Sequence, residues 1–355
     1  MRSRMLGTAA AIGTAALLLG SLGATPAVAA AKATDSACTW TKTTLPLPSG
    51  AAFGEVHATD HHGGAAGLIE NDPALPDGLG SWKNGTASLD KAGAAYTTYK
   101  VIDQNSSGTY IANTTFGWVT GPIYGFVVFK DGQQLPTAST WLYDGVLDIA
   151  ENGDITAWDK RGTSTSNPTT HIVRWNVDRP TEVTELGQIP GFPKNARPTD
   201  ADEDGTVLYT IWSSGAKNYI LRDGRAVELK KPAGLENTTA DAISNGRVVG
   251  SGTYGGKSVG VLWDNDGTVT VLPNSEKTGD LKINKSGMIV GSGGNSSTDD
   301  GIPVWQLGTF VTRVGGTGDI AHTVGDDGTI GGLTVTPSGA DLYPPKGTPA
   351  LWRCS

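Results

Sequence analysis

Ile283-Asn284-Lys285-Ser286-Gly287-Met288-Ile289-Val290-Gly291 is the clearest copy of a phrase that recurs along this chain. In each copy a small apolar stretch leads into a polar turn that closes on glycine, and a β-branched run follows. The seven closing glycines are Gly63, Gly108, Gly153, Gly205, Gly246, Gly287 and Gly328. A period in the forties, repeated seven times in a chain with 50 glycines, is typical of a propeller with four-stranded blades. We therefore predict an all-β, seven-bladed β-propeller with four antiparallel strands in each blade.

One whole blade can be followed outward from this phrase. The inner strand is expected at 281–284, the second at 288–291, the third at 302–305 and the outer fourth at 310–314. A second turn separates the third and fourth strands in other blades, where Asn-Gly or Asp-Gly pairs supply the positive φ angles of a tight hairpin. These pairs are Asn84-Gly85, Asp131-Gly132, Asp223-Gly224 and Asp266-Gly267.

A large apolar residue recurs on the third strand of every repeat. The series is Trp82, Phe129, Trp175, Leu221, Trp263, Trp305 and Trp352. Because the series follows the repeat, we interpret these side chains as anchors between blades and not as ligand contacts.

The seventh repeat is incomplete, because the chain ends directly after its third strand at Cys354. We predict that residues 43–46, just before the first blade, supply the missing fourth strand and close the ring, which removes two exposed sheet edges. Cys38 and Cys354, the two cysteines of the chain, would then fall on neighbouring strands, where a disulfide is geometrically feasible. An exported protein permits such a bridge.

Residues 1–29 have the features of a secretory signal peptide. Arg2 and Arg4 give a positive start, an apolar stretch follows, and Ala27-Val28-Ala29 matches a cleavage site. The apolar stretch is too short for a confident membrane span. We expect a secreted, extracellular protein with residues 30–355 as the propeller. A net charge of −8 without a basic stripe argues against binding to nucleic acid or to an anionic membrane.

Irregular loops on one face of the propeller are the expected place for a ligand. Aromatic rings there could stack on a sugar, although the same rings could simply fill loops or line blade interfaces. The candidates outside the repeating series are Trp118, Trp141, Tyr143, Phe192, Trp212 and Tyr254.

Two weak metal candidates stand out. Asp200, Asp202 and Asp204 offer oxygens at alternate positions of a calcium-like loop, but Ile211 occupies the position where an acidic ligand is expected. His57, His61 and His62 cluster around the first turn, in a spacing that matches no closed zinc site. His171 and His322 have no obvious partner. The sequence therefore predicts no metal or cofactor, with calcium as a weak alternative.

No zinc-protease motif or phosphate loop occurs in the chain. The phrase at 283–291, followed by Val304-Trp305, resembles the repeats of secreted bacterial propellers of the HAF-repeat type. Some actinobacterial propellers of this kind are lectins, including the lectin subunits of umbrella toxin particles. This resemblance implies carbohydrate or cell-surface binding without catalysis.

Three functions remain open at this point. The expected one is a secreted, lectin-like binding module that acts alone or as the targeting subunit of a toxin particle. The alternatives are a docking scaffold for another secreted protein in a larger complex, and an extracellular hydrolase or lyase with its site in the central channel. We expect a protein that is more a binder than an enzyme, and we assign no catalytic residues.

Overall fold

The phrase around Gly287 forms the hairpin between the first two strands of a blade, and the computed structural model repeats this four-stranded antiparallel blade seven times. The structure describes residues 38–70, 78–90, 96–116, 123–137, 143–161, 169–189, 196–213, 215–276, 278–293, 301–336 and 346–355. Within it, Thr39–Ser355 is one compact unit. No helix in these ranges is long and apolar enough to cross a membrane.

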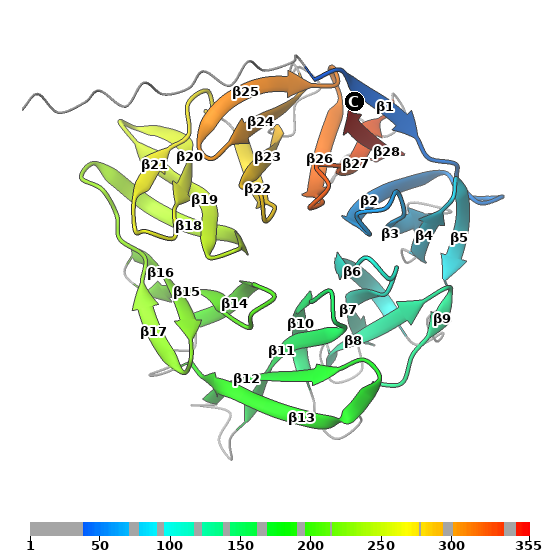
Figure 1. The fold of residues 1–355 in the computed structure, drawn as a ribbon, viewed down its shortest axis with the longest axis horizontal. Helices are drawn as coiled ribbons and strands as arrows, with labels where there is room; N and C mark the ends of the chain where they lie inside the picture. The colour runs from blue at the N-terminus through cyan, green and yellow to red at the C-terminus, as the bar shows by residue number, and fades with distance from the viewer. Residues whose placement is uncertain are drawn as a thin grey trace, which may run out of the picture. The chain divides into compact units, whose positions relative to one another are not determined.

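Blades 1 to 6 each run from an inner strand to an outer one in chain order, as Figure 1 shows in a view along the central channel. Blade 1 contains β2 (Phe53–Thr59), β3 (Ala65–Glu70), β4 (Gly78–Lys83) and β5 (Thr86–Asp90). Blade 2 contains β6 (Tyr96–Gln104), β7 (Tyr110–Phe116), β8 (Ile123–Lys130) and β9 (Gln133–Gln134). Blade 3 contains β10 (Tyr143–Ile149), β11 (Asp154–Arg161), β12 (Thr169–Asn176) and β13 (Arg179–Gln188).

The remaining blades follow the same plan. Blade 4 contains β14 (Ala196–Ala201), β15 (Val207–Ser213), β16 (Gly215–Arg222) and β17 (Arg225–Glu228). Blade 5 contains β18 (Leu235–Ser244), β19 (Arg247–Tyr254), β20 (Lys257–Trp263) and β21 (Val269–Val271). Blade 6 contains β22 (Thr278–Ile283), β23 (Met288–Gly293), β24 (Ile302–Gln306) and β25 (Thr309–Val314). Blade 7 contains β26 (Asp319–Val324), β27 (Ile330–Val335), β28 (Gly347–Cys354) and β1 (Trp40–Thr44).

The ring closes as predicted, with the N-terminal strand as the last strand of blade 7. β1 pairs antiparallel with β28, from Trp40 opposite Cys354 to Thr44 opposite Ala350. The strand therefore begins three residues before the predicted stretch at 43–46. The predicted Cys38–Cys354 disulfide is present and links the two ends of the chain.

The turn chemistry of the hairpins is confirmed in three of the four predicted pairs. Asn84, Asp131 and Asp223 have φ angles of 53°, 49° and 50°, and the glycine after each is also positive. These are the angles that a two-residue type I′ turn requires. At Asp266-Gly267 the glycine alone is positive, because this hairpin uses a longer turn closed by the bond from Gly267 N–H to the Asp264 carbonyl.

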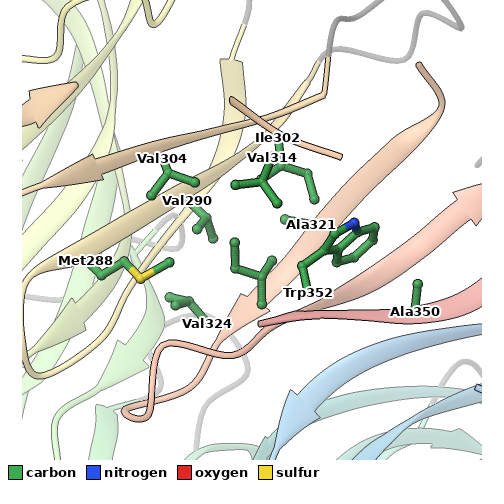
Figure 2. Packing of buried hydrophobic residues seen from close by; sticks show 10 residues of the cluster. Met288, Val290, Ile302, Val304, Val314, Ala321, Val324, Ala350 and Trp352 are labelled. Atoms are coloured by element: carbon green, nitrogen blue, oxygen red, sulfur yellow. The ribbon is translucent and has the colours of Figure 1, made fainter. Parts of the chain in front are cut away.

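The core consists of clusters between neighbouring blades. Figure 2 shows the cluster between blades 6 and 7, where Val290 and Val304 of one blade face Ala321 and Trp352 of the next. Such interfaces suit a repeat fold, because each blade buries its apolar faces against its neighbours.

The predicted anchor series is confirmed, because all seven third-strand residues are buried. Three of the tryptophans also hold the connection that enters their blade. The indole N–H groups of Trp82, Trp263 and Trp305 each donate a 2.7 Å hydrogen bond to a carbonyl there, at Pro46, Lys230 and Pro273 respectively.

Candidate functional site in the central channel

The seven inner strands share one irregularity that determines what faces the channel. Each of them has a register shift against its neighbour near the same level, a few residues before the inner turn. The residue that the ladder skips is His57 in blade 1 and His322 in blade 7. A bulge frees a side chain from the regular alternation and can aim it at a site. Because blades 1 and 7 are neighbours in the closed ring, the two histidines come together.

Glu55, His57 and His322 form what we call the His–Glu cluster. Within the described part of the chain, they are the one group of three metal-ligating side chains whose ligand atoms all lie within 4.8 Å of one another. Glu55 Oε1 is 3.1 Å from His57 Nε2, and Glu55 Oε2 is 3.3 Å from His322 Nε2. The imidazole rings are stacked, with their centroids 4.7 Å apart and an angle of 2° between the planes.

Both imidazole Nε2 atoms are buried beside the Glu55 carboxylate, at 3.1 and 3.3 Å from its oxygens, but neither is aligned for a regular hydrogen bond to it. Buried polar atoms in folded proteins nearly always have well-aligned partners, so this arrangement of two nitrogens around one carboxylate requires an explanation.

The electrostatics of the cluster favour a neutral imidazole beside an ionised carboxylate. Burial lowers the pKa of His57, and the carboxylate of Glu55 only partly opposes this shift. Burial alone would raise the pKa of Glu55, but the two histidines outweigh it and hold that pKa well below its usual value. Neutral imidazole and ionised carboxylate are the forms that bind a metal ion.

Polar contacts cross the channel at the end formed by the inner turns. Lys285 Nζ is 2.5 Å from Glu203 Oε1 in blade 4 and 2.9 Å from Asp326 Oδ2 in blade 7. His61 Nε2 lies 3.4 Å from Glu151 Oε1, and His61 Nδ1 accepts the Asp326 N–H. A cavity of about 130 Å³ remains among these side chains, and His57 and His322 line it as well.

Three further carboxylates face this cavity from consecutive blades. Asp103, Asp148 and Asp200 occupy the same position on β6, β10 and β14, directly after the bulge. Burial raises the pKa of Asp103 to about 7 and that of Asp200 to about 6, and it raises the pKa of Asp148 well above its ordinary value. Asp103 and Asp200 accept backbone N–H groups from Ile149 and Ile243 of the following blade.

Two of the six aromatic candidates have described side chains. Trp118, Trp141 and Phe192 lie outside the described residues, and for Tyr143 the backbone alone is described, at the start of β10. Trp212 is 50% exposed at the end of β15 and lines a second, larger cavity of the channel. Tyr254 is 48% exposed at the end of β19, where its ring lies against Gly234. The proposed sugar contacts stay a prediction, since no two of these aromatic side chains are in contact within the described part of the chain.

The calcium-like loop belongs to the architecture of the ring. Asp202 accepts the N–H groups of Asn245 and Gly246 in blade 5, and Asp204 accepts the Thr206 N–H. Asp200 is bonded to blade 5 as described above. All three carboxylates therefore serve turns and blade contacts, and calcium at this loop stays a prediction.

The sequence cluster of His57, His61 and His62 does not hold together, because His61 turns to Asp326 and Glu151 while His62 is exposed. The actual partners of His57 are Glu55 and His322. A signal for the pair was present in the repeat, since His57 and His322 each stand six residues before a closing glycine, Gly63 and Gly328.

Neither a protein-family model nor a curated protein sequence matches this chain. Among solved structures, it is similar to a prolyl endopeptidase with a TM-score of 0.54 and 12% identity, covering 85% of this chain and 50% of that one. It is also similar to prolyl oligopeptidase B from Galerina marginata (TM-score 0.53, 11% identity, 80% and 46% covered). A third similar structure is the acylaminoacyl peptidase of Pyrococcus horikoshii (TM-score 0.51, 14% identity, 75% and 45% covered).

The chain spans about half the length of these peptidases, and a likeness at such low identity shows the propeller fold alone. The lectin-like function expected from the sequence is wrong on this comparison, because the solved structures that the chain resembles are peptidases. The resemblance to HAF-repeat propellers and toxin-particle lectins likewise finds no support in a family model. What stands is a seven-bladed propeller with a disulfide, which is compatible with an extracellular protein.

Proposed function

We propose that this protein binds a divalent transition-metal ion in its central channel, through Glu55, His57 and His322. The observation that carries the proposal is the pair of buried Nε2 atoms that lie 3.1 and 3.3 Å from the two oxygens of one carboxylate. A metal ion would satisfy both nitrogens and the carboxylate at once.

The donor set selects the class of metal. Two imidazoles and one carboxylate suit zinc, copper, nickel and iron, whereas calcium and magnesium prefer a shell of oxygen ligands. In a tetrahedral zinc site with bonds near 2 Å, neighbouring ligand atoms lie roughly 3.3 Å apart. The 3.1 and 3.3 Å separations between Glu55 and the two histidines match this spacing. The stacked imidazole rings would turn out of their parallel arrangement so that both Nε2 lone pairs point at the ion.

Three protein ligands leave a coordination position open to the channel. An ion held in this way acts as a Lewis acid and lowers the pKa of a bound water. The chain itself holds the ligands on the inner strands β2 and β26, and packed strands fix a site more precisely than loops do.

Equilibrium titration of metal-stripped protein with Zn²⁺ tests the proposal, with Co²⁺ absorption as a second readout of the ligand geometry. We expect one Zn²⁺ per chain, and no comparable binding of Mg²⁺ or Ca²⁺. His322→Ala and Glu55→Gln should each weaken Zn²⁺ binding by at least about tenfold, because each removes one of three ligands.

The matched control is His62→Ala, which removes an exposed histidine next to the same turn and should leave Zn²⁺ binding unchanged. Equal Zn²⁺ affinity of the wild type and His322→Ala would refute the site, as would a wild type that binds no Zn²⁺.

We also propose that the protein is exported. Residues 1–29 are the proposed signal peptide, and the Cys38–Cys354 bridge is compatible with an oxidising compartment. N-terminal sequencing of protein recovered from culture medium should give Ala30 as the first residue. Recovery of the intact N-terminus with the cells would contradict export.

A further inference from the structure

The end of the channel away from the inner turns is wider than the end beside the His–Glu cluster. A cavity of about 650 Å³ opens there, at the end where the inner strands begin. Cavities that hold small molecules typically have a volume of about 300–1,000 Å³. Ile102 lines both this cavity and the smaller one beside the His–Glu cluster, so the two belong to one channel.

Two basic side chains line this end of the channel, and a third lies farther along it. Lys100 on β6 and Arg197 on β14 line the large cavity, and Lys282 on β22 lines the smaller one. Within the described residues, none of the three has a carboxylate at ion-pair distance, whereas Lys285 and His61 nearby are paired. We call Lys100, Arg197 and Lys282 the cation cluster. Unpaired cations gathered in a protein of net charge −8 indicate a site that attracts negative charge.

The acidic residues close to the cluster are already engaged with the backbone. Asp200 accepts the Ile243 N–H at 2.8 Å, and Asp241 accepts the Leu281 N–H at 3.4 Å. These carboxylates reduce the positive potential of the cluster without forming ion pairs with it.

Two of the cations stand at equivalent positions of the repeat. Lys100 and Arg197 each stand five residues before the residue that opens the inner turn, so they project from the same level of blades 2 and 4. At the equivalent position of blade 3 stands Gly145, and side chains of the neighbouring strands β7 and β11 fill the space beside it. Trp212, half exposed, lines the same cavity and offers an apolar ring face close to the charges.

We infer that this end of the channel binds a small organic anion, with its carboxylate or phosphate oxygens between Lys100 and Arg197 and its apolar part against Trp212. Arginine presents a planar fork that matches either group, and lysine adds a point charge. The inference does not depend on the metal site, although the ligand would reach the His–Glu cluster along the same channel.

The lowered pKa of Lys100 is consistent with its position among like charges in the cation cluster. The confined position of Lys100 inside the channel lowers its pKa although the side chain is exposed to solvent there, and the like charges of Lys282 and Arg197 lower it further, while Asp280 and Asp200 oppose the shift. A bound anion would relieve this repulsion, so the free cluster is electrostatically strained in a way that favours anion binding.

Titration calorimetry on metal-stripped protein tests the inference, with tryptophan fluorescence as a second readout. The probes are phenyl phosphate and phthalate, with phenol as the neutral comparison and benzylamine as the cationic one. We expect one of the two anions or both to bind once per chain, more weakly as ionic strength rises, and no binding of phenol or benzylamine. The stronger of the two anions identifies the preferred acid group.

Lys100→Gln and Arg197→Gln should each weaken binding of the anion by about tenfold, because each removes one charged donor. Lys257→Gln, at an exposed lysine that begins β20, the third strand of blade 5, is the matched control and should bind as the wild type does. The inference is overturned if neither anion binds, or if Lys257→Gln weakens binding as much as Lys100→Gln does. Since these measurements use metal-free protein, their outcome is independent of whether Zn²⁺ binds at Glu55, His57 and His322.

Discussion

The ionised side chain of Asp148 destabilises the folded protein, so its effect on stability depends on pH. Its carboxyl group is 9% exposed, and one of its oxygens, Oδ2, is buried without a hydrogen bond among the described residues. Burial raises the pKa of Asp148, and the like charges of Asp103, Asp200 and Glu203 raise it further. The folded protein therefore holds protons on Asp148 and Asp103 more tightly than the unfolded chain does. Stability from this pair is present at low pH and is lost as pH rises from about 4 to about 7, the pKa of Asp103.

Asp148→Asn should accordingly stabilise the protein above that range. At about pH 8 we expect a gain of about 1–3 kcal/mol in the free energy of unfolding, because the amide removes a buried charge that the wild type must carry. At about pH 4.5 the gain should be much smaller, since the carboxyl group is then protonated in the fold. Urea denaturation of metal-stripped protein at the two pH values measures the difference. Asp178→Asn, on an exposed hairpin, should show no such dependence, and an equal effect of Asp148→Asn at both pH values would contradict the argument.

For single residues, the sequence predicts contacts between neighbours along the chain but not contacts between residues far apart in it. The acidic turn at 200–205 and the histidines at 57–62 looked like sites because their donors are close in the chain. In the structure Asp202 accepts a hydrogen bond from blade 5. His57 stacks on His322, which lies near the other end of the sequence. Pairing of this kind depends on how the ring closes, so it could be found only by aligning the repeats and then joining the last blade to the first.

The blades were the most predictable elements, because their signals are local. Asn84-Gly85 requires two positive φ angles in a row, and the structure has them at 53° and 74°. The bulges of the inner strands left no comparable sign, since an extra residue in a strand has no fixed composition. The channel lining could therefore not be derived from alternation of apolar and polar residues.

The third-strand tryptophans offer a matched comparison between two blades. Trp305 and Trp352 are both buried at equivalent positions, but Trp305 donates a hydrogen bond to Pro273, whereas Trp352 Nε1 has no acceptor among the described residues. Trp305→Phe should thus be more destabilising than Trp352→Phe by about 1 kcal/mol, since it alone loses a hydrogen bond. Urea denaturation midpoints provide the measurement. A larger loss for Trp352→Phe would show that the indole bond to the entering connection contributes little.

On the scale of the whole molecule, the join between blades 7 and 1 concentrates several links between the chain ends. β1 pairs with β28, the Cys38–Cys354 disulfide joins their ends, and Lys42 Nζ lies 2.6 Å from Asp319 Oδ1 on β26. Lys346, just before β28, also pairs with Glu70 of blade 1. The His–Glu cluster spans the same join, because Glu55 and His57 come from β2 and His322 from β26. A metal ion bound there would connect the first and last blades from the inside of the ring.

Removal of the disulfide should therefore weaken this join before the rest of the ring. In the variant with Cys38→Ser and Cys354→Ser, a loop of nearly the whole chain is no longer closed in the unfolded state, which costs up to about 5 kcal/mol of stability. Hydrogen exchange should accelerate most at β1 and β28 and least in blade 4, on the far side of the ring from the join. Saturating Zn²⁺ should restore part of the protection at β2 and β26, because an ion that binds the closed ring alone stabilises it by mass action. The same variant with His322→Ala added is the control, and Zn²⁺ should leave its exchange unchanged. Uniform acceleration in all seven blades would mean that the ring opens as one cooperative unit and that the join has no separate stability.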